Sequence, residues 1–306
     1  MIAWGVAGNI AAFVAAILFG ASVVATRVAV QEIPPLSLAV LRFGQGGLVL
    51  LLCLLVNARD LLQIKRKDLP FLTLLGAILF SVFPLTFNAS LRLTEASRGA
   101  LMLATMPLWS AWLARAARRE HLTLSQVAGI LLTLTGVVIV LAERGLTWTG
   151  GGWALVGDGL MLLTALCGAT YGVLAQPILL RYSALTVTTY AMVIGTFILF
   201  PAAFVEGLPQ ALARIDGMVL ALILFLGIFG GALGYLLWTF ALTRLTPTQV
   251  AVYVNLNPMV ATVLGAVLLA ERLTGVFCLG FVAVLSGVFL VSLPRRVRQD
   301  PYSQAD

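Results

Sequence analysis

Charged side chains are scarce in this sequence: Asp, Glu, Lys and Arg together make up 10% of its 306 residues. Soluble proteins carry roughly 25% charged residues, so this chain has too few charges to cover a surface in water. Hydrophobic residues make up 61% of the chain, and the mean hydropathy is +1.05. The composition excludes a soluble enzyme and predicts a polytopic membrane protein.

Residues that bind metals or form disulfides are also nearly missing. The sequence has a single histidine, His121, and three cysteines in separate apolar runs, Cys53, Cys167 and Cys278. These residues provide neither a zinc site nor a disulfide framework, and no GxxxxGK[ST] phosphate loop is present. We therefore expect no catalytic residue, no metal and no cofactor. The net charge of +7 indicates topology and attraction to anionic lipid, not a nucleic-acid partner.

Ten apolar runs are long enough to form membrane helices, which need about 20 residues to cross a bilayer core of ~30 Å. The sequence therefore predicts an all-α membrane protein with ten transmembrane helices and short connections. The runs are Gly8–Val30, Leu36–Asn57, Pro70–Asn88, Ala100–Ala114, Val127–Leu141, Gly157–Leu179, Thr186–Val205, Met218–Ala241, Val250–Leu269 and Val276–Leu293.

The distribution of basic residues predicts the orientation of the chain. With the N-terminus in the cytoplasm, the cytoplasmic segments hold twelve Lys and Arg residues and the external segments hold six. Cytoplasmic loops carry the excess of basic residues in membrane proteins. Both termini are therefore predicted to be cytoplasmic.

The sequence contains an internal repeat with an offset of 151 residues. At this offset Pro107 aligns with Pro258 and Glu120 with Glu271, and Gly76, Gly129 and Gly136 align with Gly227, Gly280 and Gly287. We predict a five-helix repeat over residues 1–145, a second over 146–294 and a basic tail over 295–306. Five is an odd number, so the second repeat enters the membrane inverted. Inverted repeats are typical of secondary transporters that work by alternating access.

The sequence resembles the EamA-type ten-span exporters of the drug/metabolite transporter superfamily. The resemblance rests on LFGASVVATRVA (18–29), on PPLSLAVLRF (34–43), and on two copies of a Pro–Glu–Gly–Gly pattern that begin at MPLW and NPMV. Arg27 departs from the family, whose members often have Lys there, and Arg42 has no counterpart in the second half. The resemblance implies export of amino acids or other small metabolites across a bacterial inner membrane, without fixing the substrate.

Three prolines are expected to lie within membrane helices and to bend them. Pro107 and Pro258 would free the carbonyls of Leu103 and Val254, and freed carbonyls in a bilayer must face protein or a water-filled cavity. Pro84 is a weaker case of the same kind. These prolines are either gating kinks that line a cavity or structural kinks.

Polar residues in the apolar runs are candidate substrate ligands. Asn255 and Asn257 precede Pro258, and each either hydrogen-bonds a substrate or satisfies backbone groups that the proline opens. Small hydroxyl side chains often bond back to their own helix, so they carry less weight. The candidates of this class are Ser22, Ser81, Asn88, Thr105, Tyr253, Asn255 and Asn257.

Aromatic residues are the second class of candidate ligands. Tyr171 and Tyr235 lie beside glycine pairs of the kind that let helices approach closely, which directs these side chains toward a central space. An aromatic-lined cavity favours aromatic or large neutral amino acids. The candidates of this class are Phe80, Phe83, Trp109, Tyr171, Tyr235 and Trp238.

Charges within the apolar runs are few. Arg42 either anchors a substrate carboxylate or caps carbonyl groups near the external side, and Asp158 lies near the start of its helix, where an acid favourably meets the helix dipole. Because so few acids are buried, no carrier for obligatory proton coupling is evident. Facilitated diffusion and exchange stay equally open.

The sequence therefore predicts an alternating-access exporter of small metabolites, most of all amino acids, in the bacterial inner membrane. Its predicted partners are a small-molecule substrate and the lipid bilayer, and its oligomeric state is open. A passive channel and a membrane-embedded lipid enzyme are the alternatives. The enzyme would need a cluster of acids, His or Cys at one membrane face, and the sequence shows none.

Overall fold

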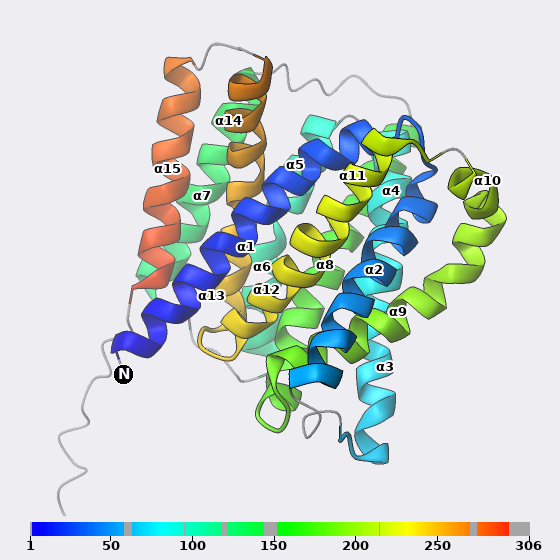
Figure 1. Cartoon of the computed structure of the whole chain (residues 1–306). Helices are drawn as coiled ribbons and strands as arrows, with labels where there is room; N and C mark the ends of the chain where they lie inside the picture. Colours follow the sequence, from blue (N-terminus) through cyan, green and yellow to red (C-terminus); the bar gives the residue numbers. More distant parts are fainter. Residues whose placement is uncertain are drawn as a thin grey trace, which may run out of the picture.

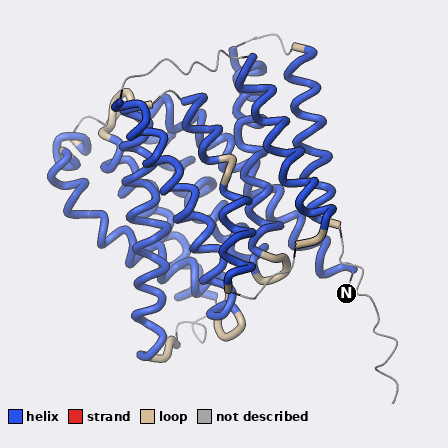
Figure 2. The backbone as a smooth tube through the Cα atoms, turned by 180° about the vertical axis from the view of Figure 1, so that it is seen from behind, coloured by secondary structure: helices blue, strands red, loops and turns tan. Residues whose placement is uncertain are grey.

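The computed structural model describes residues 2–57, 63–94, 96–117, 122–143, 152–213, 215–269 and 274–293. Within these ranges the regular structure is helical throughout (Figures 1 and 2). Glu120 and Glu271, which align in the predicted repeat, and the predicted tail 295–306 lie outside the described residues. The all-α membrane fold is therefore confirmed for the part of the chain that the structure covers.

Eight helices are long and apolar enough to cross a membrane. Their bounds agree with eight of the ten predicted runs to within a few residues at most ends. These spans are Gly5–Thr26, Pro35–Val56, Arg66–Leu93, Leu124–Ala142, Gly152–Leu179, Ala184–Glu206, Gly217–Leu242 and Gly275–Ser292.

The helices of the first half follow one another with short connections. They are α1 (Ile2–Ala29), α2 (Pro35–Asn57), η2 (Arg66–Asp68), α3 (Leu69–Ala77), η3 (Ile78–Val82), α4 (Phe83–Leu93), α5 (Ala96–Leu103), α6 (Met106–Ala116) and α7 (Leu124–Glu143).

The second half repeats much of this order. Its helices are α8 (Gly152–Leu179), α9 (Ala184–Glu206), α10 (Leu208–Leu212), α11 (Gly217–Phe225), η4 (Leu226–Leu233), α12 (Gly234–Leu242), α13 (Pro247–Val252), η5 (Tyr253–Leu256), α14 (Asn257–Leu269) and α15 (Gly275–Ser292).

Polar side chains mark where several of these helices begin. Ser183 accepts a hydrogen bond from the backbone amide of Thr186 at the start of α9, and Thr274 caps α15 in the same way. At α13, Thr246 and Gln249 form a reciprocal capping box. Such caps satisfy amide groups that have no partner within the helix, so these short polar segments fix where the apolar helices start.

The two remaining predicted runs, Ala100–Ala114 and Val250–Leu269, are interrupted helices. The first is divided into α5 and α6 by a turn at Ala104–Thr105, and the second into α13 and α14 by the 3₁₀ segment η5. The expectation that these runs form continuous kinked helices is therefore wrong. Proline is favoured in the first turn of a helix, where its missing N–H costs no hydrogen bond.

The prolines accordingly begin new helices. Pro107 stands in the first turn of α6, Pro258 follows the first residue of α14, and Pro84 lies in the first turn of α4. Pro84 follows the π-helical segment η3, and the corresponding helix of the second half contains the π-helical segment η4. Irregular backbone therefore occurs at similar places in both halves.

Helices α7 and α15 pack against each other at one edge of the bundle (Figure 1). A methyl carbon placed on Gly129 would lie 2.7 Å from the carbonyl oxygen of Gly287, and one on Gly136 would lie 2.6 Å from that of Gly280. Real side chains do not approach so closely, so all four positions require glycine. The two backbones are in direct contact.

A second set of close backbone contacts lies within the main bundle. A methyl carbon on Gly195 of α9 would collide with the carbonyl oxygen of Gly76 of α3, and one on Gly46 of α2 would lie 3.0 Å from that of Gly227 of η4. Helices α2 and α9 also pack against each other. These contacts bring the backbone of α3 against that of α9 and the backbone of α2 against that of η4.

Candidate functional site

Tyr235 lies at the centre of a cluster of aromatic rings. Its ring centroid is 4.9 Å from that of Phe19, 5.0 Å from that of Phe80 and 5.6 Å from that of Phe43. Tilted and edge-on arrangements at these distances are favourable for aromatic pairs. The cluster draws its rings from α1, α2, η3 and α12, so it joins the first half of the chain to the second.

Two further predicted site residues extend this aromatic cluster. The ring of Tyr171 on α8 lies 6.5 Å from that of Phe80, and the ring of Trp238 lies 6.0 Å from that of Phe19. Tyr171 is fully buried, and its hydroxyl group lies 3.1 Å from the hydroxyl of Thr239. Four predicted residues, Phe80, Tyr171, Tyr235 and Trp238, are therefore brought together by the fold.

Arg42 and Ser22 lie beside the aromatic cluster. The Arg42 guanidinium donates a hydrogen bond of 3.1 Å from Nη2 to the carbonyl oxygen of Gly230, and its Cζ atom lies 5.3 Å from the ring centroid of Phe43. A methyl carbon on Gly230 would collide with the Ser22 hydroxyl, so Ser22 faces the same position of η4. Arg42 does cap a carbonyl group, as one of its two predicted roles requires.

The break between α5 and α6 is held by Thr105. Its hydroxyl donates to the carbonyl oxygen of Met102 at 2.6 Å and accepts from Nε1 of Trp109 at 3.2 Å. The predicted site residues Thr105 and Trp109 thus contact each other. Their hydrogen bonds fix the local shape of the break.

The two asparagines at the second break retain unused hydrogen-bonding capacity. Nδ2 of Asn255 donates to the Thr133 hydroxyl on α7 at 3.0 Å. The Oδ1 atoms of Asn255 and Asn257 are buried, and within the described part of the chain neither has a hydrogen-bond partner. Buried polar atoms are nearly always paired, which marks these two atoms as candidate ligand contacts.

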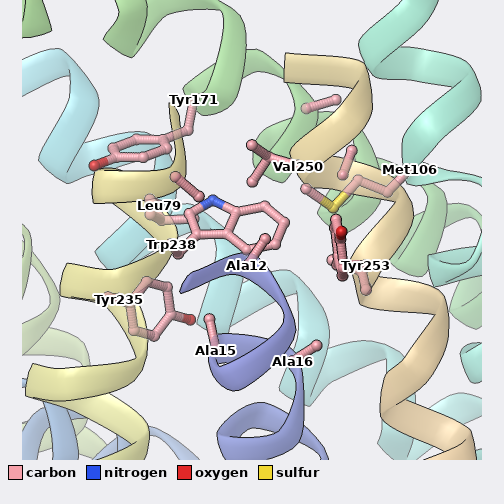
Figure 3. Packing of buried hydrophobic residues seen from close by; sticks show 14 of the residues in the cluster. Ala12, Ala15, Ala16, Leu79, Met106, Tyr171, Tyr235, Trp238, Val250 and Tyr253 are labelled. Atoms are coloured by element: carbon pink, nitrogen blue, oxygen red, sulfur yellow. The ribbon is translucent and has the colours of Figure 1, made fainter. Parts of the chain in front are cut away.

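Tyr253 lies on the other side of α1 from Tyr235. Figure 3 shows Ala12, Ala15 and Ala16 of α1 between the two tyrosines. The Tyr253 hydroxyl donates to Oδ1 of Asn9 at 3.0 Å and lies 3.2 Å from the Ser292 hydroxyl.

These polar groups lie in an open groove, with a volume of about 420 Å³, between α1 and α15. Tyr253 therefore belongs to this groove and not to the aromatic cluster.

Ser81, Phe83 and Asn88 are spread along η3 and α4. The Ser81 hydroxyl donates to the carbonyl oxygen of Gly195 at 2.7 Å, and Nδ2 of Asn88 donates to that of Pro35 at 3.1 Å. The ring of Phe83 stacks on that of Phe87. The structure thus uses the polar groups of Ser81 and Asn88 for contacts between helices, and it does not bring them to one place.

At one end of the bundle, Glu206 connects three helices. This carboxylate, the last residue of α9, accepts hydrogen bonds from the backbone amides of Leu36 at 2.7 Å and Ser37 at 3.0 Å, in the first turn of α2. It also forms an ion pair of 3.0 Å with Arg92 near the end of α4. A carboxylate at a helix N-terminus meets both free amides and the positive end of the helix dipole.

At the opposite end of α9, Asp68 performs a similar role with different partners. Its carboxylate accepts from Nη1 of Arg181 and from the hydroxyl of Tyr182, both at 2.8 Å. Asp68 precedes α3, and the two partners lie between α8 and α9. The ion pairs at the two ends thus both join the first half of the chain to the second.

Several of these residues are not candidates from the sequence. Phe19 and Phe43 complete the aromatic cluster, and Glu206 and Asp68 form the end clusters. Phe43 directly follows Arg42, so the neighbouring intramembrane charge is a signal that would have found it. Nothing in the spacing of Glu206 and Arg92, which are 114 residues apart, indicates their contact.

Comparison with protein families identifies the chain. The model of the EamA-like transporter family matches it twice, over residues 6–142 and 155–293. A solved crystal structure has the same fold, with a TM-score of 0.79 at 18% sequence identity, over 92% of this chain and 95% of that one.

Relatives over most of the chain are named as transporters. An uncharacterized transporter of Archaeoglobus fulgidus is 27% identical over 89% of this chain and 94% of its own length. A probable amino-acid metabolite efflux pump of Salmonella typhimurium is 29% identical over 94% and 95% of the two chains. A probable terminal-alkyne amino-acid exporter of Streptantibioticus cattleyicolor is 27% identical over 74% of each. With both halves matched, the chain is a membrane transporter, not an enzyme, and belongs to the EamA-like transporter family.

Proposed function

We propose that this protein is a secondary transporter that exports amino acids, above all aromatic or large neutral ones, by alternating access. Family membership makes it a transporter. The observation that carries the choice of substrate is the aromatic cluster around Tyr235, which lies between the two halves of the chain. Amino-acid export is also named for some relatives at 27% and 29% identity.

The proposed mechanism requires two inverted five-helix repeats. Two separate matches to one family model support the repeat. The contacts of α7 and α15 support the inversion: Gly129 and Gly136 correspond to Gly280 and Gly287, and Gly129 meets Gly287 while Gly136 meets Gly280. A twofold axis in the membrane plane, passing between these helices, exchanges one contact for the other.

Other features of the two halves support the same symmetry. The contact of Gly76 with Gly195 corresponds to that of Gly227 with Gly46. The π-helical segments η3 and η4 and the breaks before α6 and α14 also fall at corresponding places. In this proposal the interrupted runs Ala100–Ala114 and Val250–Leu269 are the fourth and ninth of ten spans. Two equivalent halves can exchange conformations, which gives inward-open and outward-open states of similar energy.

We further propose that the protein resides in the bacterial inner membrane with both termini in the cytoplasm, as the excess of cytoplasmic Lys and Arg favours. Equivalent loops of inverted repeats must face opposite sides. After replacement of the three native cysteines, Glu32→Cys and Leu180→Cys should react with an impermeant thiol reagent from opposite sides of the membrane. Reaction of both from one side would overturn the inverted topology.

Transport in proteoliposomes tests the function itself. A panel of labelled amino acids should show saturable flux with preference for aromatic or large neutral members, and unlabelled substrate on the far side should accelerate it. Flux that rises linearly with concentration and shows no such acceleration would indicate a passive channel. Equal flux for all members of the panel would overturn the proposed aromatic selectivity.

Two single variants link the flux to the proposed site. Tyr235→Leu should lower flux at least tenfold at an unchanged amount of folded protein, and Asn257→Ala should lower it less. The matched control is Trp112→Leu, because Trp112 is 62% exposed and lies outside the cluster. Unchanged flux in Tyr235→Leu would remove the aromatic cluster from the transport path.

A further inference from the structure

Arg42 carries a charge inside a membrane span. It is the eighth residue of α2, and at a rise of ~1.5 Å per residue it lies about 10 Å along the helix from Pro35. Charged side chains within membrane spans are expensive and are retained where they pair with another group or serve a function. The partners of Arg42 therefore decide what it does.

The structure provides Arg42 with only part of what a buried guanidinium needs. Nη2 donates to the carbonyl oxygen of Gly230 at 3.1 Å, and the face of Phe43 lies against the guanidinium. Its Nε atom is buried and has no hydrogen-bond partner within the described part of the chain. Among the described residues, no carboxylate forms an ion pair with Arg42. This half-buried cation thus has no counter-charge among the described residues, and its buried Nε–H group is unpaired there.

The surroundings of Arg42 match an amino acid better than a simple anion. The ring of Phe43 lies 5.3 Å from Cζ of Arg42 and 5.6 Å from the ring of Tyr235, so the cation adjoins the aromatic cluster directly. Glycine is required at position 230, because a methyl carbon there would collide with the Ser22 hydroxyl and lie 3.1 Å from Nη2 of Arg42, so the guanidinium packs directly against this backbone. A carboxylate on the guanidinium would therefore place an attached apolar side chain next to Phe43 and Tyr235.

We propose that Arg42 binds the carboxylate of the transported solute and supplies its specificity for acids over amides and amines. The planar guanidinium matches a carboxylate with two parallel hydrogen bonds. Because Gly46 of α2 corresponds to Gly195 of α9, the position that corresponds to Arg42 in the second half is Ala191, so only one of the two halves provides this cation. The solute then binds with a fixed polarity, its carboxylate at α2. This inference rests on the proposed transport function and names the chemical group that the site recognises.

Competition in proteoliposomes tests the inference. Uptake of labelled L-phenylalanine is measured with unlabelled L-phenylalanine, L-phenylalaninamide or phenethylamine as competitor. In the unmodified protein the acid should compete at least tenfold better than the other two, which is the order expected for a charge-assisted hydrogen bond. In Arg42→Gln the acid and the amide should compete equally. Arg42→Lys keeps a positive charge but loses the planar guanidinium. In this variant the preference for the acid over the amide should be reduced but present.

The control is Gln45→Leu, which removes another buried polar group from the same helix, less than one turn away, and leaves the charge in place. It should retain the preference for the acid. Folding of each variant is checked by size-exclusion chromatography in detergent. If Arg42→Gln does not fold, Arg42→Lys decides: weaker competition by the acid with unchanged competition by the amide supports the proposal, and equal competition to the unmodified protein overturns it.

The two proposals fail differently. Absence of saturable uptake of any amino acid by the unmodified protein would overturn the transport function. Saturable uptake of phenylalanine in which the acid and the amide compete equally, or in which Arg42→Gln keeps the preference, would overturn only the role of Arg42.

Discussion

The two ends of α9 are held by carboxylates of different kinds. At its far end, Glu206 accepts two backbone amides in the first turn of α2 as well as the side chain of Arg92. At its beginning, Asp68 is held by side chains alone, those of Arg181 and Tyr182. Backbone amides at a helix start cannot turn toward another partner, whereas side chains can rotate into water. The Glu206 end is thus held more firmly than the Asp68 end, which is released more easily.

The middle of α9 differs from both ends. There Gly195 lies against the backbone of Gly76, and its carbonyl oxygen accepts the hydroxyl of Ser81. The span formed by α3, η3 and α4 therefore contacts the middle of α9, and the two ion pairs connect this span to the segments at the two ends of α9. Movement between the halves that separates these helices must release at least one of the two end clusters.

Chemical cross-linking should have the largest effect on transport. With the native cysteines replaced, the pairs Asp68→Cys with Arg181→Cys and Arg92→Cys with Glu206→Cys are each joined by a flexible bifunctional thiol reagent. Alternating access requires both ends to open in turn, so either link should reduce flux to near zero, and cleavage of a reducible link should restore it. Full flux with one end linked would show that this end does not open.

Removal of the Glu206 side chain should cause the largest loss of stability. In Glu206→Ala the amides of Leu36 and Ser37 lose their acceptor, and each buried donor left unpaired is costly. We expect the free energy of unfolding to fall by about 2–4 kcal/mol, measured as a lower midpoint of thermal unfolding in detergent. The exposed residue Glu32 provides the matched control, and an equal loss in Glu32→Ala would contradict the capping role.

The corresponding change at the other end should cost much less stability. Asp68→Asn keeps an oxygen that accepts from Tyr182 and loses only the charge opposite Arg181, whose side chain is 50% exposed. Exposed partners of this kind rehydrate easily. The midpoint of thermal unfolding should therefore shift far less than in Glu206→Ala. A loss as large as that variant's would show that the Asp68 end is held as firmly as the Glu206 end.

The smallest effect should come from the Arg92 charge. Its side chain is 62% exposed, so Arg92→Gln should lower the free energy of unfolding by only about 0.5 kcal/mol. Raising the salt concentration from 0.1 M to 1 M shortens the screening length from ~10 Å to ~3 Å, and the difference from the unmodified protein should then disappear. A difference that persists in 1 M salt would mean that packing, and not charge, accounts for the effect.

The sequence predicts the helices of this protein well. The predicted run Leu36–Asn57 is helix α2, Pro35–Asn57, because a long apolar segment bounded by Pro and polar residues has few alternatives in a membrane. The breaks before α6 and α14 were missed, since Pro107 and Pro258 were placed inside helices. Proline is favoured in the first turn of a helix, where its missing N–H costs no hydrogen bond, and this local signal would have located both breaks.

The site is predictable only in part, because membrane helices are apolar on every side and their pattern does not show which side faces inward. Tyr171 and Tyr235 lie in one aromatic cluster, in contact with Phe80. Tyr253 and Asn88 have equally suitable side chains, but their helices direct them to Asn9 and Pro35 instead. The orientation of each helix about its own axis decides which of these groups come into contact. That orientation depends on the packing of all the helices.

The backbone contact of α7 with α15 has a consequence for how the protein moves. Because Gly129 and Gly136 lie directly on the carbonyl groups of Gly287 and Gly280, a slide of one residue along either axis would press neighbouring side chains into the opposite main chain. At these glycines no side chains separate the two backbones. The two helices therefore move as one rigid unit, and the conformational change that moves a solute must take place in the other helices.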